Sequence, residues 1–191
     1  MKKEVWKGGN MLYPVPAVMI SCQREGERPN IITAAWVGTV CSDPPMVSVS
    51  IRPERYSWGI IKETGQFVIN LTTKDLVKAA DYCGVRSGKT IDKFKEMHLT
   101  PSPASAVSCP LIDESPVNLE CVVTQVISLG THDMFLAEIK AVDVSGDLMD
   151  ENGKLDLAKA DLTTYSHGVY HALGDEIGTF GYSVRKHRKG E

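Results

Sequence analysis

Two short stretches of the sequence carry side chains that could together bind a flat ring and a phosphate. The first, "TAAW" (33–36), sets small side chains in a row, so that a ring could approach the backbone and meet its peptide N–H groups. The second, "RPERYS" (52–57), offers two guanidinium and two hydroxyl groups where a helix is expected to begin. Arginine side chains and helix N-termini both favour bound phosphate. A solvated basic loop is the alternative interpretation of the second stretch.

The segment between these stretches has the pattern of a half-buried strand. In "MVSVSIR" (46–52), three apolar side chains alternate with Ser48, Ser50 and Arg52, which is the period of a strand with one buried face. A further polar cluster is "RSGKTIDKF" (86–94). It could form a surface helix with its charges in solvent. Alternatively, one of its lysines could reach a phosphate while Phe94 covers the edge of a ring. The strand is therefore expected to act as a spacer between two ends of one ligand.

Strands dominate the rest of the chain, and helices are inserted between them instead of alternating with them. Further strands are expected at 15–22, 66–71, 117–129 and 133–144, and helices at 54–65, 72–84 and 89–97. This order indicates a mainly β protein, either a closed antiparallel barrel or an open sandwich. The loop at 100–116 is long for a compact domain, so we expect it to pack on a surface or against a partner.

Composition narrows the class of protein. The chain has 191 residues, 42% hydrophobic, with a net charge of −3, which is typical of one globular domain spanning 1–191. This balance argues against nucleic-acid binding. No signal peptide or apolar segment long enough for a membrane span is evident, so a cytoplasmic protein without membrane contact is expected.

Common catalytic and metal-binding patterns are missing from the sequence. The five cysteines have no paired spacing and are expected to be free thiols. His167 and His171 share i, i+4 spacing, but no acidic or thiol ligand is close to them in sequence, so no metal site is expected. Nucleotide, zinc-protease and esterase motifs are also absent.

Five motifs, in order, resemble the flavin reductase-like family of FMN-binding split barrels, and its flavoredoxin branch in particular. They cover about residues 12–145 and read "NIITAAW", "SDPPMVSVSIRPERYSW", "TGQFVINL", "SGKTIDKF" and "GTHDMFLAEIKAV". The resemblance implies a six-stranded antiparallel Greek-key split barrel with inserted short helices. It also implies a homodimer with FMN in a groove near the subunit interface. The stretch "IRPERYS" departs from the "NRSSRT"-like sequence of many flavin reductases, which shifts the resemblance toward flavoredoxins.

The resemblance also assigns roles to individual residues. His132 would contact the nicotinamide or a substrate, although it could equally be a structural residue of a hairpin turn. The FMN-binding residues would border the ring, follow the ribityl chain, hold the phosphate and close the site; in chain order they are Thr33, Ala34, Ala35, Trp36, Ser50, Ile51, Arg52, Arg55, Tyr56, Ser57, Lys93 and Phe94.

Three functions follow as competing hypotheses. The first is an oxidoreductase that passes electrons from NAD(P)H through FMN to free flavin, ferric complexes or a protein acceptor. The second is a flavoredoxin-type electron carrier with bound FMN and no nicotinamide site. The third is a flavin-free binding module or another relative within the split-barrel superfamily. The protein supplies orientation and electrostatics in the first two, and the flavin supplies the redox chemistry.

Overall fold

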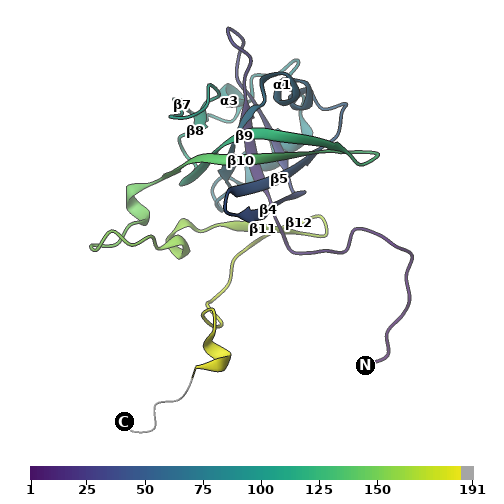
Figure 1. Ribbon diagram of the computed structural model, residues 1–191, viewed down its shortest axis with the longest axis vertical. Helices are drawn as coiled ribbons and strands as arrows, with labels where there is room; N and C mark the ends of the chain where they lie inside the picture. The colour runs from purple at the N-terminus through teal and green to yellow at the C-terminus, as the bar shows by residue number, and fades with distance from the viewer. Residues whose placement is uncertain (186–191) are drawn as a thin grey trace.

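One antiparallel sheet that curls on itself forms the body of the protein (Figure 1). The computed structural model describes residues 1–185. The sheet order is β3-β2-β6-β9-β10-β5-β4. The bounds of these strands are β2 Val18–Cys22, β3 Asn30–Ala34, β4 Val37–Ser42, β5 Pro45–Ile51, β6 Gln66–Leu71, β9 Val117–Ser128 and β10 Asp133–Val144.

The two edge strands of this sheet are halves of one bent segment. β3 pairs with β2 at one edge and β4 pairs with β5 at the other, and only Ala35 and Trp36 separate β3 from β4. The backbone N–H of Ser50 donates a hydrogen bond of 2.9 Å to the carbonyl of Trp36 across this break. With β3 and β4 counted as one strand, the sheet is the predicted six-stranded barrel, interrupted at Ala35–Trp36.

Alternation along the strands fills the barrel. Val47, Val49 and Ile51 are buried as predicted, and they pack in one cluster with Phe67 and Phe135. Such side chains recur every second residue because successive residues of a strand point to opposite faces. The interior of the barrel is therefore a packed core, and ligand space has to lie at its edges.

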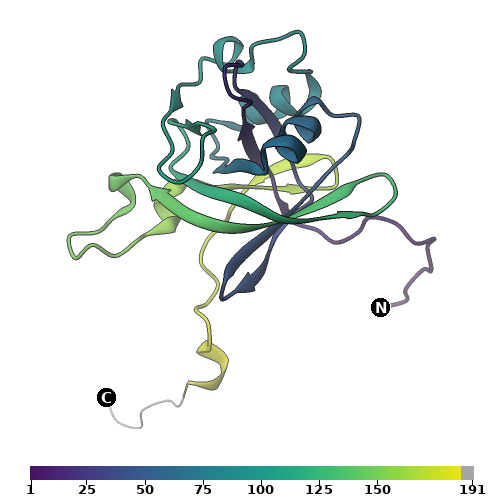
Figure 2. The same cartoon turned by 45° about the horizontal axis from the view of Figure 1, so that its top comes forward.

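Within residues 1–185, three α-helices pack against the barrel (Figure 2). Helix α1 (Tyr56–Thr64) contributes to the barrel core and ends at Gly65, which has a φ of 67° and so takes the left-handed conformation that favours glycine. Helices α2 (Val77–Val85) and α3 (Lys93–Glu96) pack in a second cluster against the outer side of β2 and β3. The second helix begins later than predicted, because Thr73 forms an isolated β-bridge with Leu162 and the chain turns before the helix starts.

The loop at 100–116 packs on the outside of the barrel. The buried carboxylate of Glu120, on β9, accepts hydrogen bonds from the backbone N–H groups of Ser105 (2.8 Å) and Val107 (2.9 Å). Gln66 accepts a further bond of 2.9 Å from the N–H of Ser108. Within this loop lie two short paired strands, β7 (Pro101–Ser102) and β8 (Leu111–Ile112). The loop thus packs on the surface of its own barrel, which is one of the two arrangements predicted from the sequence.

A small three-stranded sheet and two extended ends complete the chain. The small sheet joins β1 (Val15–Pro16) to the hairpin of β11 (Thr163–Ser166) and β12 (Val169–Ala172). Both ends of the described chain project from the body (Figure 1). No helix within the described residues is long and apolar enough to span a bilayer. The remaining elements are the 3-10 helices η1 Gly146–Leu148, η2 Leu157–Ala160 and η3 Tyr182–Val184.

Candidate functional site

A cavity of about 230 Å³ opens at the interruption of the barrel and is named here the break pocket. Most of the residues expected to bind a ligand line this pocket. They include residues from both of the stretches that strand β5 separates in the sequence. Its lining residues are Ile32, Thr33, Ala34, Ala35, Trp36, Ser50, Ile51, Arg52, Arg55 and His132.

Small side chains line the break pocket along the bent segment. The Thr33 hydroxyl donates a 2.5 Å hydrogen bond to the carbonyl of Ala80 on α2. Ala34 and Ala35 add only methyl groups, and Trp36 is half-buried. A planar ring could therefore approach the backbone closely, as the sequence pattern predicts.

His132 reaches the same pocket from the turn between β9 and β10. The strand pairing sets Asp133 opposite Ile51, which brings this turn beside the end of β5. Two hydrogen bonds to the Asp133 carboxylate fix the turn, one of 2.9 Å from the Trp58 indole and one of 2.6 Å from the Ser128 hydroxyl. These bonds lower the pKa of Asp133, so it stays ionised near neutral pH. His132 is thus held by a rigid turn.

A second cavity, of about 150 Å³, adjoins the break pocket and shares Ile32 and Arg55 with it. We name it the basic pocket because three cationic side chains, Arg55, Arg86 and Lys93, line it and only one carboxylate, Glu54, does. Its remaining lining residues are Asn30, Ile32, Tyr56, Ser57, Val85, Ser87 and Gly88.

The basic pocket lies at the start of helix α1. No side chain caps this N-terminus, and its first turn holds no acidic residue. Uncapped N–H groups and the helix dipole attract an anion, and guanidinium groups can pair with phosphate oxygens in bidentate fashion. The arrangement suits a phosphate, with Tyr56 and Ser57 on the helix and Arg55 before it.

Lys93 differs from the other two cations because it is also part of the core. Only 3% of its surface is exposed. Its ammonium group donates hydrogen bonds to the carbonyls of Ile31 (2.6 Å) and Cys83 (2.8 Å), which ties α3 to β3 and α2. Burial, aided by the neighbouring charge of Arg55, lowers the pKa of Lys93 from 10.5 to about 8. Lys93 therefore both holds the fold together and lines the basic pocket.

Two predicted residues lie away from the centre of the site. Phe94 is buried in the cluster between α2, α3 and β3 and lines neither pocket. Arg52 is exposed and lies 3.6 Å from the Glu54 carboxylate, at the edge of the break pocket. Arg55 stands between the two pockets, and it donates a hydrogen bond to the carbonyl of Gly84.

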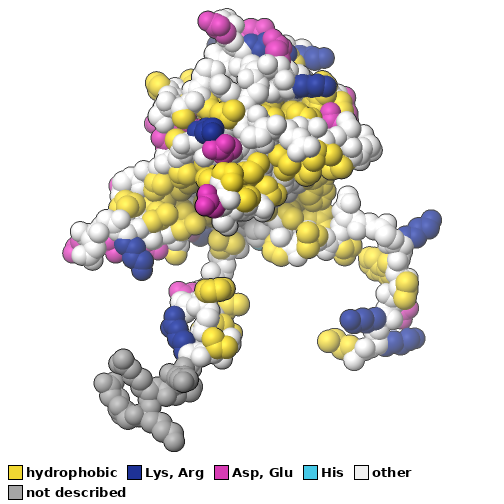
Figure 3. Space-filling model, viewed as in Figure 1, with side chains coloured by type: hydrophobic (Ala, Val, Ile, Leu, Met, Phe, Trp, Pro, Cys, Tyr) yellow, Lys and Arg dark blue, Asp and Glu magenta, His cyan; other side chains and the backbone are white. Residues whose placement is uncertain are grey.

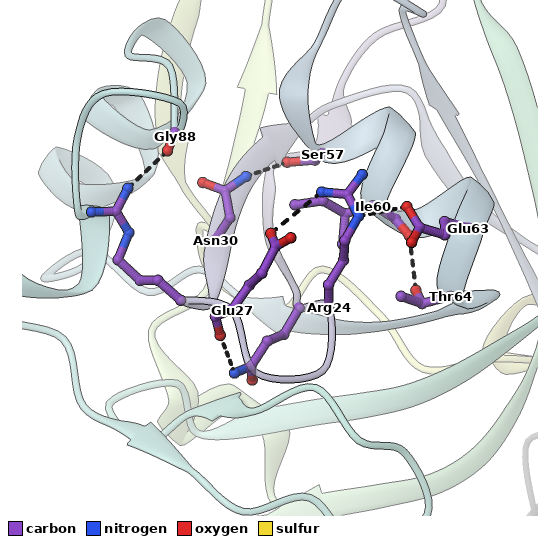
Figure 4. A network of polar contacts seen from close by, with 10 residues as sticks. Arg24, Glu27, Asn30, Ser57, Ile60, Glu63, Thr64 and Gly88 are labelled. Carbon is purple, nitrogen blue, oxygen red and sulfur yellow. Dashed lines mark hydrogen bonds and ion pairs between the residues drawn. The ribbon is translucent and has the colours of Figure 1, made fainter.

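Sequence reasoning missed Asn30, Arg86 and Gly88, which complete the basic pocket. Asn30 donates a 2.7 Å hydrogen bond to the Ser57 hydroxyl, and Arg28 donates one of 3.0 Å to the carbonyl of Gly88 (Figure 4). The side-chain oxygen of Asn30 is buried without a partner among residues 1–185. A Cβ atom on residue 88 would fall 1.9 Å from that oxygen, so any residue larger than glycine would displace the Asn30 side chain. Their position within the motifs "NIITAAW" and "RSGKTIDKF" was the sequence signal that could have identified these three residues.

A larger cavity, of about 580 Å³, adjoins the break pocket at Ala35, Trp36 and Ser50. Residues 9–12 of the N-terminal segment and strand β4 form its other walls. The two histidines with helical spacing, His167 and His171, lie instead on the β11–β12 hairpin. Within the described part of the chain, no three metal-ligating side chains come together.

Comparison with known proteins gives consistent results. The model of the flavin reductase like domain family matches residues 10–174. The flavoredoxin of Desulfovibrio vulgaris (Miyazaki F) superimposes with a TM-score of 0.89 at 32% identity, over 97% of this chain and 100% of that one. The flavoredoxin from Methanosarcina acetivorans gives 0.85 at 28% identity, over 96% and 100%. An FMN reductase (NADH) of Escherichia coli is 27% identical over 110 residues, which are 58% of this chain and 65% of the relative.

Proposed function

The chain belongs to the flavin reductase-like family, and we propose that it is an FMN-binding oxidoreductase that takes electrons from NAD(P)H. The acceptor would be free flavin, a ferric complex or a protein. Flavin-related electron transfer has the broadest support, because both flavoredoxins and FMN reductases are among the relatives. The particular donor and acceptor belong to the proposal.

The continuity of the basic pocket and the break pocket carries this proposal. FMN has a phosphate at one end and a planar ring at the other, and the two pockets meet at Arg55. Three cations and an uncapped helix suit the phosphate, and the small side chains of 33–35 leave space for the ring. The residues present therefore fit the cofactor. Arg55, Arg86 and Ser57 would hold the phosphate, and Thr33 to Trp36 would border the ring.

Bound FMN would supply the electron-transfer chemistry, and the chain would supply binding and electrostatics. Peptide N–H groups of the bent segment would stabilise negative charge on the ring, as preorganised donors do in an oxyanion hole. His132 lines the same pocket, where it would position the donor. The proposal requires no protein nucleophile.

The 580 Å³ cavity favours a nicotinamide-dependent reductase over the alternative. It shares Trp36 with the break pocket and is large enough for part of a second substrate. The alternative is an electron carrier of the flavoredoxin type, with bound FMN and no nicotinamide site. The names of the two flavoredoxin neighbours are the observation in its favour.

The visible spectrum of the purified protein tests the proposal first. Flavin absorbance that bleaches rapidly with NADH or NADPH supports the reductase. Flavin absorbance that only dithionite or reduced ferredoxin bleaches supports the carrier. A colourless protein that gains no absorbance from added FMN contradicts both.

We also propose a cytoplasmic homodimer. Both projecting ends carry apolar side chains toward solvent, visible as yellow atoms on the two arms in Figure 3. Trp6 is 77% exposed and Leu12 87%, and Phe180 is fully exposed in the other arm. Such surface is normally covered by a partner. Light scattering of the full chain at several concentrations would measure its mass, and a monomer throughout would contradict this part of the proposal.

A further inference from the structure

Another cavity, of about 260 Å³, adjoins the break pocket at Thr33, Ala35 and Trp36. Four aromatic side chains from three separate parts of the chain line it, and we name the group they form with Asp81 the aromatic cage. The aromatic members are Tyr13, Trp36, Tyr165 and Tyr170. Small side chains, among them Ala17 and Gly84, line the rest of the cavity.

The rings of the aromatic cage meet at steep angles. Tyr13 lies 6.2 Å from Trp36 and 6.3 Å from Tyr165 between ring centroids, with interplanar angles of 44° and 59°. Tyr165 lies 5.5 Å from Tyr170 at 64°. None of these pairs is stacked face to face, and His167 packs against Tyr13 in the same way, at 5.9 Å and 78°. The space for a ligand is the cavity that the four aromatic side chains line. A π face turned toward that cavity would attract a positive charge.

The charge of the cage is negative. Asp81, on α2, is the one charged side chain that lines it, and no Lys, Arg or His does so. The Tyr170 hydroxyl lies 3.4 Å from the Asp81 carboxylate and donates to it. Burial and the nearby Asp81 raise the pKa of Tyr170 to about 12, which keeps this donor protonated at neutral pH. No ion pair neutralises Asp81 within residues 1–185.

We propose that the aromatic cage binds a small organic cation with an alkylated nitrogen, such as a quaternary ammonium or an N-alkylpyridinium ion. Aromatic faces attract such cations, whose charge is spread over carbon atoms that are weakly hydrated. The Asp81 carboxylate adds a counter-charge and repels anions. The volume suits a single head group and is too small for a dinucleotide. Its walls belong to the protein, and three of them, Thr33, Ala35 and Trp36, also line the break pocket.

Two matched pairs of ligands test the proposal by isothermal titration calorimetry on the full chain. Choline is compared with its neutral isostere 3,3-dimethylbutan-1-ol, and 1-methylnicotinamide with nicotinamide. Asp81 is exposed and the four aromatic side chains are half-buried. We expect at least one cation to bind about tenfold or more tightly than its neutral partner, as several cation–π contacts and a carboxylate together allow. The tighter of the two cations identifies the head group. Equal affinity within both pairs, or binding of neither cation at millimolar concentration, overturns the proposal.

Variants then localise the binding. Asp81→Asn should weaken the cation and leave the neutral isostere unchanged. Tyr165→Leu should weaken the cation by about 2- to 30-fold, the range of one cation–π contact. Asp75→Asn is the matched control, since Asp75 is exposed just before the same helix and lines none of the cavities described.

Circular dichroism verifies that each variant is folded. Tyr170→Phe keeps the ring and removes only the hydroxyl that donates to Asp81, so it separates the aromatic face from that hydrogen bond. It should leave cation affinity within about twofold, because an aromatic face remains. Asp81→Asn remains the test if Tyr165→Leu does not fold. Unchanged affinity in Asp81→Asn together with a larger loss in Asp75→Asn would contradict the assignment.

Discussion

The basic pocket and the aromatic cage both adjoin the break pocket, yet they have opposite chemistry. The basic pocket has three cations around a helix start, whereas the aromatic cage has one carboxylate among four rings. The bent segment of the barrel lines both cavities, with Ile32 in the basic pocket and Trp36 in the aromatic cage. The difference comes largely from elements added to the barrel. These are α1, α3 and the residues after α2 on one side, and α2 with the β11–β12 hairpin on the other. The barrel thus provides the position, and the additions provide the chemistry.

Removing two cations should give the largest effect and separate the two regions most clearly. Arg55→Ala with Arg86→Ala should weaken FMN binding by about 100-fold or more, because two charge-assisted phosphate contacts of about 1.5–3 kcal/mol each would be lost. Flavin fluorescence titration measures this. Choline affinity in the aromatic cage should stay the same.

Arg24→Ala is the control for that variant. Arg24 pairs with the Glu63 carboxylate at 2.5 Å, beside α1, and lines neither pocket (Figure 4). A comparable loss of FMN affinity in both variants would show that general surface charge, and not the basic pocket, governs binding.

A variant at Lys93 tests whether this cation of the basic pocket stabilises the fold or only binds the ligand. Lys93→Met should lower the free energy of unfolding by about 2–4 kcal/mol, since two buried carbonyls would lose their donor. Urea unfolding measures the change. The loss should occur without FMN as well as with it. A variant as stable as the wild type without FMN would limit the role of Lys93 to the ligand.

The same lysine predicts a pH dependence. Its folded pKa of about 8 lies below the ordinary 10.5, so between these values the unfolded chain binds more protons and stability rises with pH. The buried thiols of Cys22, Cys83, Cys109 and Cys121, whose pKa values burial raises above 9.0, oppose this rise as the unfolded thiols ionise. These thiols are present in Lys93→Met as well, so the comparison of the two proteins isolates the lysine. The difference in unfolding free energy between the wild type and Lys93→Met should therefore increase from pH 8 to pH 9, and a constant difference would point to another group.

His132 should give the smallest effect, because it lines the break pocket but neither of the two regions compared. His132→Ala should slow flavin bleaching by NAD(P)H about fivefold, the worth of one hydrogen bond of about 1 kcal/mol. FMN affinity should change by less than about twofold. Stopped-flow absorbance and fluorescence titration measure the two quantities. Unchanged bleaching would assign His132 to the turn alone.

Much of the site could be predicted from local patterns. The alternation in 46–52 specified which side chains enter the barrel, and the five ordered motifs indicated the six-stranded fold and the family. Thr33, Ser50 and His132 were placed together by motif order, and they line one pocket. Local patterns succeed here because strand geometry assigns every second side chain to one face, whatever the partner strands are.

The sequence by itself determined the strands, the small-residue segment and the basic stretch before α1. Only the tertiary structure decided that Lys93 turns into the core beside Phe94, that Asn30 meets Gly88, and that Asp81 meets the tyrosines of a distant hairpin. These contacts join residues far apart in the chain, and Tyr170 lies 89 positions from Asp81. Periodicity describes the direction of a side chain relative to its own element. The groups that lie opposite it depend on how the barrel closes and where the helices and the hairpin pack.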